Sequence, residues 1–75
     1  MFSLKQVEAL YWISQLGTFE RAAARLNTTQ STISKRIHEL ERVAGLPLFD
    51  RSQRSARLTD KGEQLLGLAQ EMLGL

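Results

Sequence analysis

Cysteine is absent from the 75 residues, and histidine occurs once, at His38. Without cysteine the chain can form no disulfide and offers no thiolate to a metal, and one imidazole cannot build a metal site by itself. We therefore expect no metal and no other cofactor, and the lack of thiols fits a reducing cytoplasm. A domain this short buries only a modest part of its surface, so a partner chain is the expected source of extra stability.

Long apolar runs and the usual catalytic sets are also missing. No segment approaches the roughly 20 apolar residues that a membrane-spanning helix requires. Residues 1–5 lack a basic stretch leading into an apolar one, so we expect no signal peptide. The sequence offers no Ser-His-Asp set, carboxylate pair or glycine-rich phosphate loop in usable form, so it does not read as an enzyme.

The net charge is only +2, but it is unevenly distributed. Residues 21–61 hold nine Lys or Arg against four Asp or Glu, a balance of +5, whereas residues 1–20 carry −1 and residues 62–75 carry −2. This asymmetry points to an anionic partner for the middle of the chain. On charge alone, an ordinary solvated surface explains the pattern about equally well.

Capping residues and apolar spacing predict helices in the first part of the chain. Ser3 caps a helix over residues 4–16 that ends at Gly17, and Thr18 caps a short helix over residues 19–26. The first helix is apolar on two sides, a pattern typical of a helix packed between others. Trp12 belongs to this apolar surface and is assigned to the core or to a dimer interface. Its nearest charges in sequence are acidic, which argues against a base-stacking role.

A third helix is predicted over residues 30–44, capped by Thr29 or Thr28 and ended by Gly45. Its inner face is a stripe of apolar residues at helical spacing: Ile33, Ile37, Leu40 and Ala44. Residues 48–51 and 56–59 then alternate around a polar stretch and predict a small β-hairpin.

Thr59 caps a last helix with an apolar stripe that reaches the end of the chain. Because the preceding helices and hairpin already form a closed unit, we expect this stripe to face a second copy of the chain. The expected dimer interface consists of Trp12, Leu65, Leu66, Ala69, Met72 and Leu73.

The outward face of the third helix carries polar side chains that can bond base edges. Glutamine can bond adenine with two hydrogen bonds, lysine can reach guanine, and serine can bond either base. The N-terminal part of the second helix of a helix-turn-helix reads bases in the major groove. The base-reading candidates in this part are Gln30, Ser31, Ser34 and Lys35. A solvated face is the alternative, weakened by the short alanine-rich helix before it and the basic hairpin after it.

Further residues are candidates for contacts with the phosphate backbone or the minor groove. Arg54 at the hairpin tip fits a narrow minor groove, which attracts arginine through its negative potential. Arg51 and Arg57 fit phosphates, or ion pairs with Asp50 or Glu41. The remaining backbone candidates are Thr18, Arg21, Thr29, His38 and Arg42, of which the threonines also serve as caps and His38 also fits plain solvation. Glu39 and Glu41 are interpreted as partners of Arg42, Arg36 or Lys35.

The sequence resembles the DNA-binding domain of LysR-type transcriptional regulators. The matching segments are FERAAARL at residues 19–26, TQSTISKRI at 29–37, GLPLFDR at 45–51 and RLTDKG at 57–62. Together with Leu40-Glu41 they span nearly the whole chain, and the set is highly specific at this spacing. The base-reading positions of the family match those named above, and its wing arginine matches Arg54.

The resemblance implies a mostly α winged helix-turn-helix, with a three-helix core and a small β-hairpin wing, over residues 1–58. Residues 59–75 would begin a linker helix that pairs two chains, and the effector-binding domain would be absent. The implied function is sequence-specific binding of promoter or operator DNA by a homodimer on an inexact palindrome, in the bacterial cytoplasm at the nucleoid. A small-molecule co-inducer is expected only for the missing C-terminal domain.

Two other functions compete with this interpretation. A protein-interaction module would use the apolar surfaces of the first and last helices and show no salt-dependent affinity for duplex DNA. A non-specific or structure-reading DNA binder would bind all duplexes with similar affinity.

Overall fold

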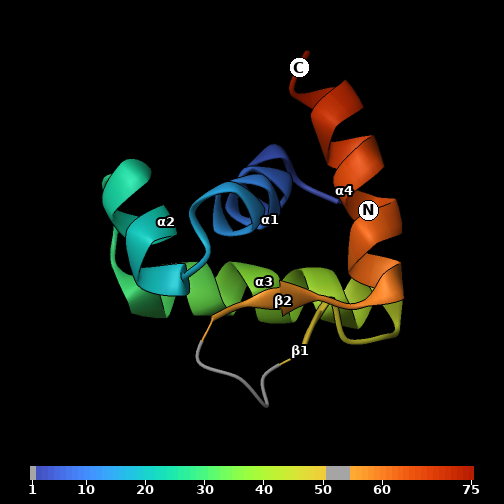
Figure 1. Ribbon diagram of the computed structural model, residues 1–75, viewed down its shortest axis with the longest axis horizontal. Helices are drawn as coiled ribbons and strands as arrows, with labels where there is room; N and C mark the ends of the chain where they lie inside the picture. The colour runs from blue at the N-terminus through green and yellow to red at the C-terminus, as the bar shows by residue number, and fades with distance from the viewer. Residues whose placement is uncertain (1, 51–54) are drawn as a thin grey trace.

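The computed structural model describes residues 2–50 and 55–75. This part of the chain forms four helices and a two-stranded hairpin (Figure 1). The elements are α1 (Leu4–Leu16), α2 (Phe19–Arg25), α3 (Gln30–Ala44), β1 (Phe49–Asp50), β2 (Arg57–Leu58) and α4 (Asp60–Met72). The predicted winged helix-turn-helix is confirmed, although the strands are shorter than predicted and α2 ends one residue earlier. Arg51 and Arg54, for which contacts with DNA are predicted, lie outside the described residues.

Side-chain caps fix where the helices begin. The hydroxyl of Ser3 accepts a hydrogen bond from the backbone N–H of Gln6 at 3.2 Å, and the Gln6 side chain accepts one from the Ser3 N–H at 3.1 Å. This reciprocal capping box satisfies two N–H groups that the helix itself leaves unpaired. For α3 the cap is Thr29, whose Oγ1 accepts from the Thr32 N–H at 3.2 Å. The alternative cap, Thr28, is therefore wrong.

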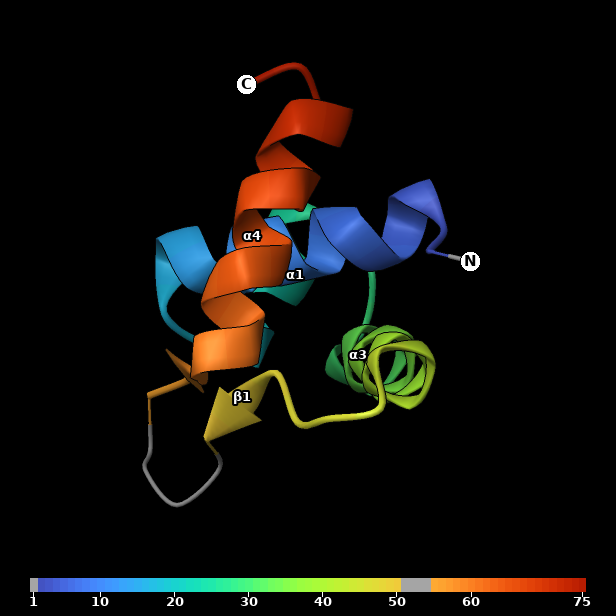
Figure 2. The same cartoon turned by 90° about the vertical axis from the view of Figure 1, so that its right-hand side faces the viewer.

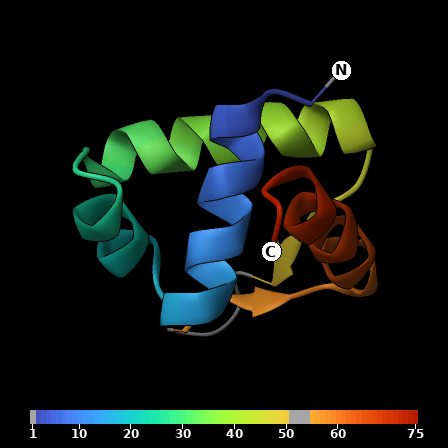
Figure 3. The ribbon, with the colours of Figure 1, turned by 90° about the horizontal axis from the view of Figure 1, so that it is seen from above.

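Helix α1 is the centre of the arrangement. It lies across α3, with α2 on one side and α4 on the other (Figure 3), and it packs against all three. A helix in this position must be apolar on more than one side, which explains the two apolar faces in its sequence. The core that results comprises Val7, Ala9, Leu10, Ile13, Ala22, Ala23, Ile33, Ile37, Leu40, Leu48, Phe49, Leu65 and Ala69.

The packing of α4 corrects the expectation that its apolar stripe has little core left to cover. Leu65 is 3% exposed and Ala69 is 0% exposed within the single chain, so both face α1 of their own chain and not a partner. The reason is that α1 leaves one side open after packing on α2 and α3, and α4 fills it. Leu66 is half-buried, and Leu73 packs partly against the core. Met72 remains 49% exposed.

The hairpin lies below α4 and beside α3 (Figure 2). Its strands are antiparallel, with Phe49 opposite Leu58 and Asp50 opposite Arg57. The Phe49 ring meets the Phe19 ring of α2 edge to face, with centroids 5.5 Å apart. The hairpin is thus attached to the helical core and has a defined position beside α3.

Within residues 2–50 and 55–75, no helix combines the length and apolar character needed to cross a membrane.

Candidate nucleic-acid interface

The polar face of α3 follows from the burial of its apolar stripe. Ile33, Ile37 and Leu40 are 0% exposed, so the opposite side of the helix is turned away from the protein. That side borders a shallow surface depression lined by Gln30, Ser31, Ser34, Lys35, His38, Glu39 and Arg42. All four predicted base-reading residues therefore lie together on one surface, with Ser34 half-buried and the other three exposed.

The base of the hairpin adjoins this surface. A second depression is lined by His38, Glu41, Pro47, Phe49, Asp50, Arg57, Leu58 and Thr59. Because His38 borders both depressions, the C-terminal half of the α3 face continues toward the strands. Arg57 is exposed on β2 where the second depression adjoins α3. The structure thus brings one of the residues predicted to contact the DNA backbone beside α3.

The N-terminus of α2 carries two further predicted backbone residues. Thr18 Oγ1 accepts a hydrogen bond from the Arg21 N–H at 3.0 Å, which makes Thr18 the cap of this helix. The exposed Arg21 side chain lies near the end of α1, with Nη1 3.4 Å from the Leu16 carbonyl oxygen. The hydroxyl of Thr29 also has partners within the protein. It caps α3 and lies 2.8 Å from the hydroxyl of Thr32.

Glu41 has a hydrogen-bond partner that the sequence did not predict. Its Oε2 accepts a hydrogen bond from the backbone N–H of Leu48 at 2.8 Å, so the carboxylate ties α3 to the segment before β1. The sequence suggested ion pairs for Glu41, with Arg42, Arg36 or Lys35 of the same helix or with Arg51 or Arg57 of the hairpin, and did not point to a backbone partner. Local spacing could not reveal the backbone partner, because it depends on how residues 45–48 turn back along α3.

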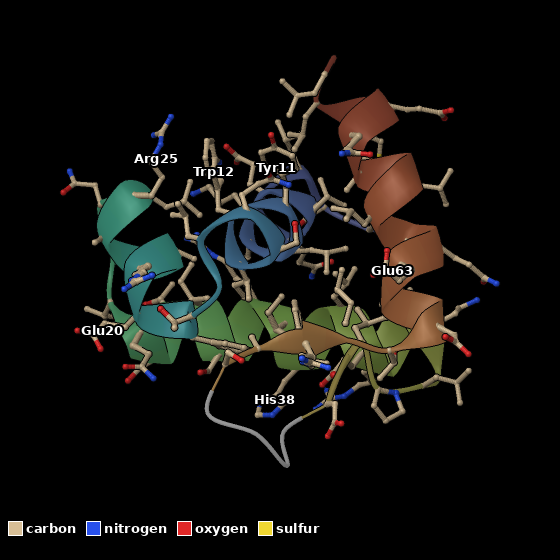
Figure 4. The ribbon with its side chains drawn as sticks, viewed as in Figure 1. Tyr11, Trp12, Glu20, Arg25, His38 and Glu63 are labelled. Atoms are coloured by element: carbon tan, nitrogen blue, oxygen red, sulfur yellow. The ribbon has the colours of Figure 1, made fainter. Side chains whose placement is uncertain are left out.

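An aromatic cluster lies on the other side of the molecule. The Arg25 guanidinium stacks over the Trp12 ring, 4.2 Å from its centroid, and the Tyr11 and Trp12 rings meet edge to face at 5.0 Å. Figure 4 shows these three side chains above α1 and α2, whereas His38 points below α3. The sequence pointed only to acidic neighbours of Trp12 and missed Arg25, which the packing of α2 on α1 brings close. Trp12 is half-buried and packs against the core, so it is remote from the α3 face.

The three-helix core, the turn between α2 and α3 and the attached hairpin define the class of protein. A short helix followed by a tight turn and a second helix with an exposed polar face is a helix-turn-helix, and the hairpin is its wing.

The chain belongs to one family within this class. Its residues 4–63 match the family model described as bacterial regulatory helix-turn-helix protein, lysR family. This confirms the resemblance seen in the sequence. The chain accordingly contains a helix-turn-helix domain of the LysR type.

Individual relatives agree with this assignment. A probable RuBisCO transcriptional regulator of Trichormus variabilis is 40% identical over 74 residues, which cover 99% of this chain and 22% of the relative. The structure of the CbnR DBD–DNA complex superposes with a TM-score of 0.90 at 29% identity, covering 96% of this chain and 83% of that one. Vibrio fischeri DarR in complex with DNA gives a TM-score of 0.91 at 29% identity, covering 96% and 25%. The chain thus spans about a fifth of the length of the curated relative.

Proposed function

We propose that this chain binds double-stranded DNA in a sequence-specific manner and forms the DNA-binding part of a bacterial transcription regulator. The observation that carries the proposal is the exposed polar face of α3, directly opposite its buried stripe. A helix of this width enters the major groove, which is about 12 Å wide. The solved complexes of CbnR and DarR with DNA support the same use of this fold.

Four residues near the start of α3 read the bases in this proposal. Gln30 bonds adenine N6 and N7, Lys35 donates to guanine O6 and N7, and the two serines bond either base. The short side chains of Ser31 and Ser34 also let the helix backbone approach the groove floor. The N-terminal position of these residues in α3 fits the part of a recognition helix that contacts base edges.

The surrounding basic and polar groups hold the domain on the phosphate backbone. The proposed backbone contacts are Thr18, Arg21, Thr29, His38, Arg42, Arg51 and Arg57. Each neutralised phosphate releases counterions, so these contacts give affinity that falls as salt rises. Arg54 is proposed to enter the minor groove beside the site, where narrowing strengthens the negative potential.

Two copies are proposed to bind an inexact palindrome through pairing of α4. The inner side of α4 is occupied by its own chain, so the pairing surface must be the outer one. There Leu68 is 51% exposed and Met72 49%, and their spacing of four places them on one side of the helix. Leu75, which is 69% exposed, follows the end of the helix. We call the exposed side chains of Leu68 and Met72 the outer α4 face.

The domain boundaries remain part of the same proposal. Residues 1–58 form the DNA-binding domain and residues 59–75 begin a linker helix, after which an effector-binding domain would follow in the whole regulator. Any co-inducer would bind that further domain. Because promoter DNA lies in the nucleoid, the proposed function implies a location in the bacterial cytoplasm.

The test is selection of bound duplexes from a random pool, with the unchanged chain and with Gln30→Ala. We expect the unchanged chain to enrich an inverted repeat. Gln30→Ala should lose discrimination at one base pair of each half-site, worth about 1–3 kcal/mol. An identical enriched sequence for both proteins would refute base reading by Gln30.

Arg57→Ala is the contrasting variant. It should weaken binding to all duplexes by similar factors and lower the slope of log K against log salt by ~0.9, the value for one phosphate contact. Similar affinity of the unchanged chain for every duplex would favour a non-specific binder. No salt-dependent affinity at all would favour a protein-interaction module.

A further inference from the structure

Four segments of the chain meet at the backbone of Leu48. Its N–H donates to Glu41 Oε2 of α3 at 2.8 Å, and its carbonyl oxygen accepts from the Thr59 N–H at 3.0 Å, at the end of β2. The Leu48 side chain is 0% exposed, so the residue is anchored in the core as well. One residue therefore connects the recognition helix to the hairpin.

The same point also fixes the start of α4. Thr59 Oγ1 donates to the Pro47 carbonyl oxygen at 2.7 Å and accepts from the Gly62 N–H at 3.1 Å. A methyl group on Gly62 would overlap the Leu48 carbonyl oxygen, so the first turn of α4 lies directly against the Leu48 backbone. We call Glu41, Leu48, Thr59 and Gly62 the junction.

The length of α4 makes its angle at the junction matter. The helix has 13 residues. At ~1.5 Å per residue it is ~20 Å long, so a tilt of about 10° at its start moves its far end by ~3.4 Å, the rise of one base pair. One base pair also turns the duplex by about 34°, since a helical turn holds ~10.5. A loose junction would therefore change the spacing at which two recognition helices reach the DNA.

We infer that Glu41 is a positioning residue that sets the distance between the two half-sites without touching DNA. Its carboxylate holds Leu48, and through Leu48 and Thr59 it ties α3 to the start of α4, in addition to the packing of both helices on α1. The inference rests on the proposed function, in which α4 pairs two copies on an inverted repeat. It predicts that loss of the carboxylate relaxes spacing while base reading within a half-site is unchanged.

The test measures affinity for inverted repeats of one fixed half-site whose separation is changed in single base-pair steps. For the unchanged chain we expect the best spacing to exceed its neighbours by about tenfold. For Glu41→Ala that ratio should fall below about threefold, while affinity for a duplex with one half-site changes less than about twofold. Glu41→Gln keeps an oxygen that accepts the Leu48 N–H, so it should restore the sharp profile.

Glu63→Ala is the matched control, because it removes an exposed carboxylate from the first turn of α4. It should raise affinity for all spacings by similar factors and keep the profile. A sharp profile for Glu41→Ala, or a broad one for Glu41→Gln, would overturn the inference. If Glu41→Ala does not fold, Thr59→Val removes the hydrogen bond to Pro47 and must broaden the profile instead. Absence of any spacing preference in the unchanged chain would mean that the proposed function itself fails.

Discussion

At the scale of single residues, two glycines of α4 have opposite surroundings. Gly62 is buried, and a methyl group there would overlap the Leu48 carbonyl oxygen and lie 2.8 Å from Leu58 Cδ2. Gly67 is exposed, and a methyl group there would meet nothing within 4 Å among the described atoms. The same substitution should therefore have opposite effects at the two positions.

We expect Gly62→Ala to lower the free energy of unfolding by about 1–3 kcal/mol, because a backbone carbonyl cannot move aside as a flexible side chain can. Gly67→Ala should raise it by about 0.5–1 kcal/mol, because alanine in a helix loses less conformational freedom than glycine. Urea denaturation followed by circular dichroism measures both. Equal stability of Gly62→Ala and the unchanged chain would contradict the close approach of α4 to Leu48.

At the scale of the element, the recognition helix depends on its N-terminal cap. Thr29→Ala should cost about 1 kcal/mol of folding free energy, since the Thr32 N–H loses its acceptor at the start of α3. Thr28→Ala is the control and should cost less, because Thr28 lies outside the capping position. Thermal melts without DNA separate this effect from any phosphate contact. The assignment of the cap fails if the two variants melt at the same temperature.

Local signals explain why most elements could be predicted from the sequence. A cap such as Thr29 and a stripe such as Ile33, Ile37 and Leu40 involve residues within a few positions of one another, so their spacing carries the information. The exposed face of α3 is then determined as the side opposite the stripe. The candidate base-reading surface could therefore be predicted from the sequence alone.

Contacts between distant segments explain what the sequence left out. The inner side of α4 could not be assigned, because whether Leu65 covers α1 or a partner depends on how much of α1 the other helices leave open. The hydrogen bond from Leu48 to Glu41 depends on the path of the loop after α3. The stacking of Arg25 on Trp12 depends on how α2 crosses α1.

At the scale of the whole molecule, three surfaces have different characters. The polar face of α3 and the base of the hairpin lie on one side, and the aromatic cluster around Trp12 lies on the opposite side (Figure 4). The outer α4 face is apolar and exposed, whereas the inner side of the same helix is part of the core. Folding and the proposed pairing therefore use different residues of one helix and can be separated by mutation.

Leu68→Glu tests pairing through the outer α4 face. The side chain is 51% exposed, so the change should alter the folding free energy by no more than about 0.5 kcal/mol. Two copies would then bring glutamates together on an apolar surface, and we expect affinity for the inverted repeat to fall by at least about tenfold. Affinity for a duplex with a single half-site should stay within about twofold of that of the unchanged chain.

Leu65→Ala is the counterpart on the inner side of α4. Leu65 is 3% exposed, and its truncation should cost about 2–5 kcal/mol of stability. Where the variant is still folded, it should bind the inverted repeat as two copies. Sedimentation of each protein with the inverted-repeat duplex counts the bound chains. Two chains bound with unchanged affinity for Leu68→Glu would exclude the outer face, because an apolar contact cannot bury that carboxylate without a measurable loss.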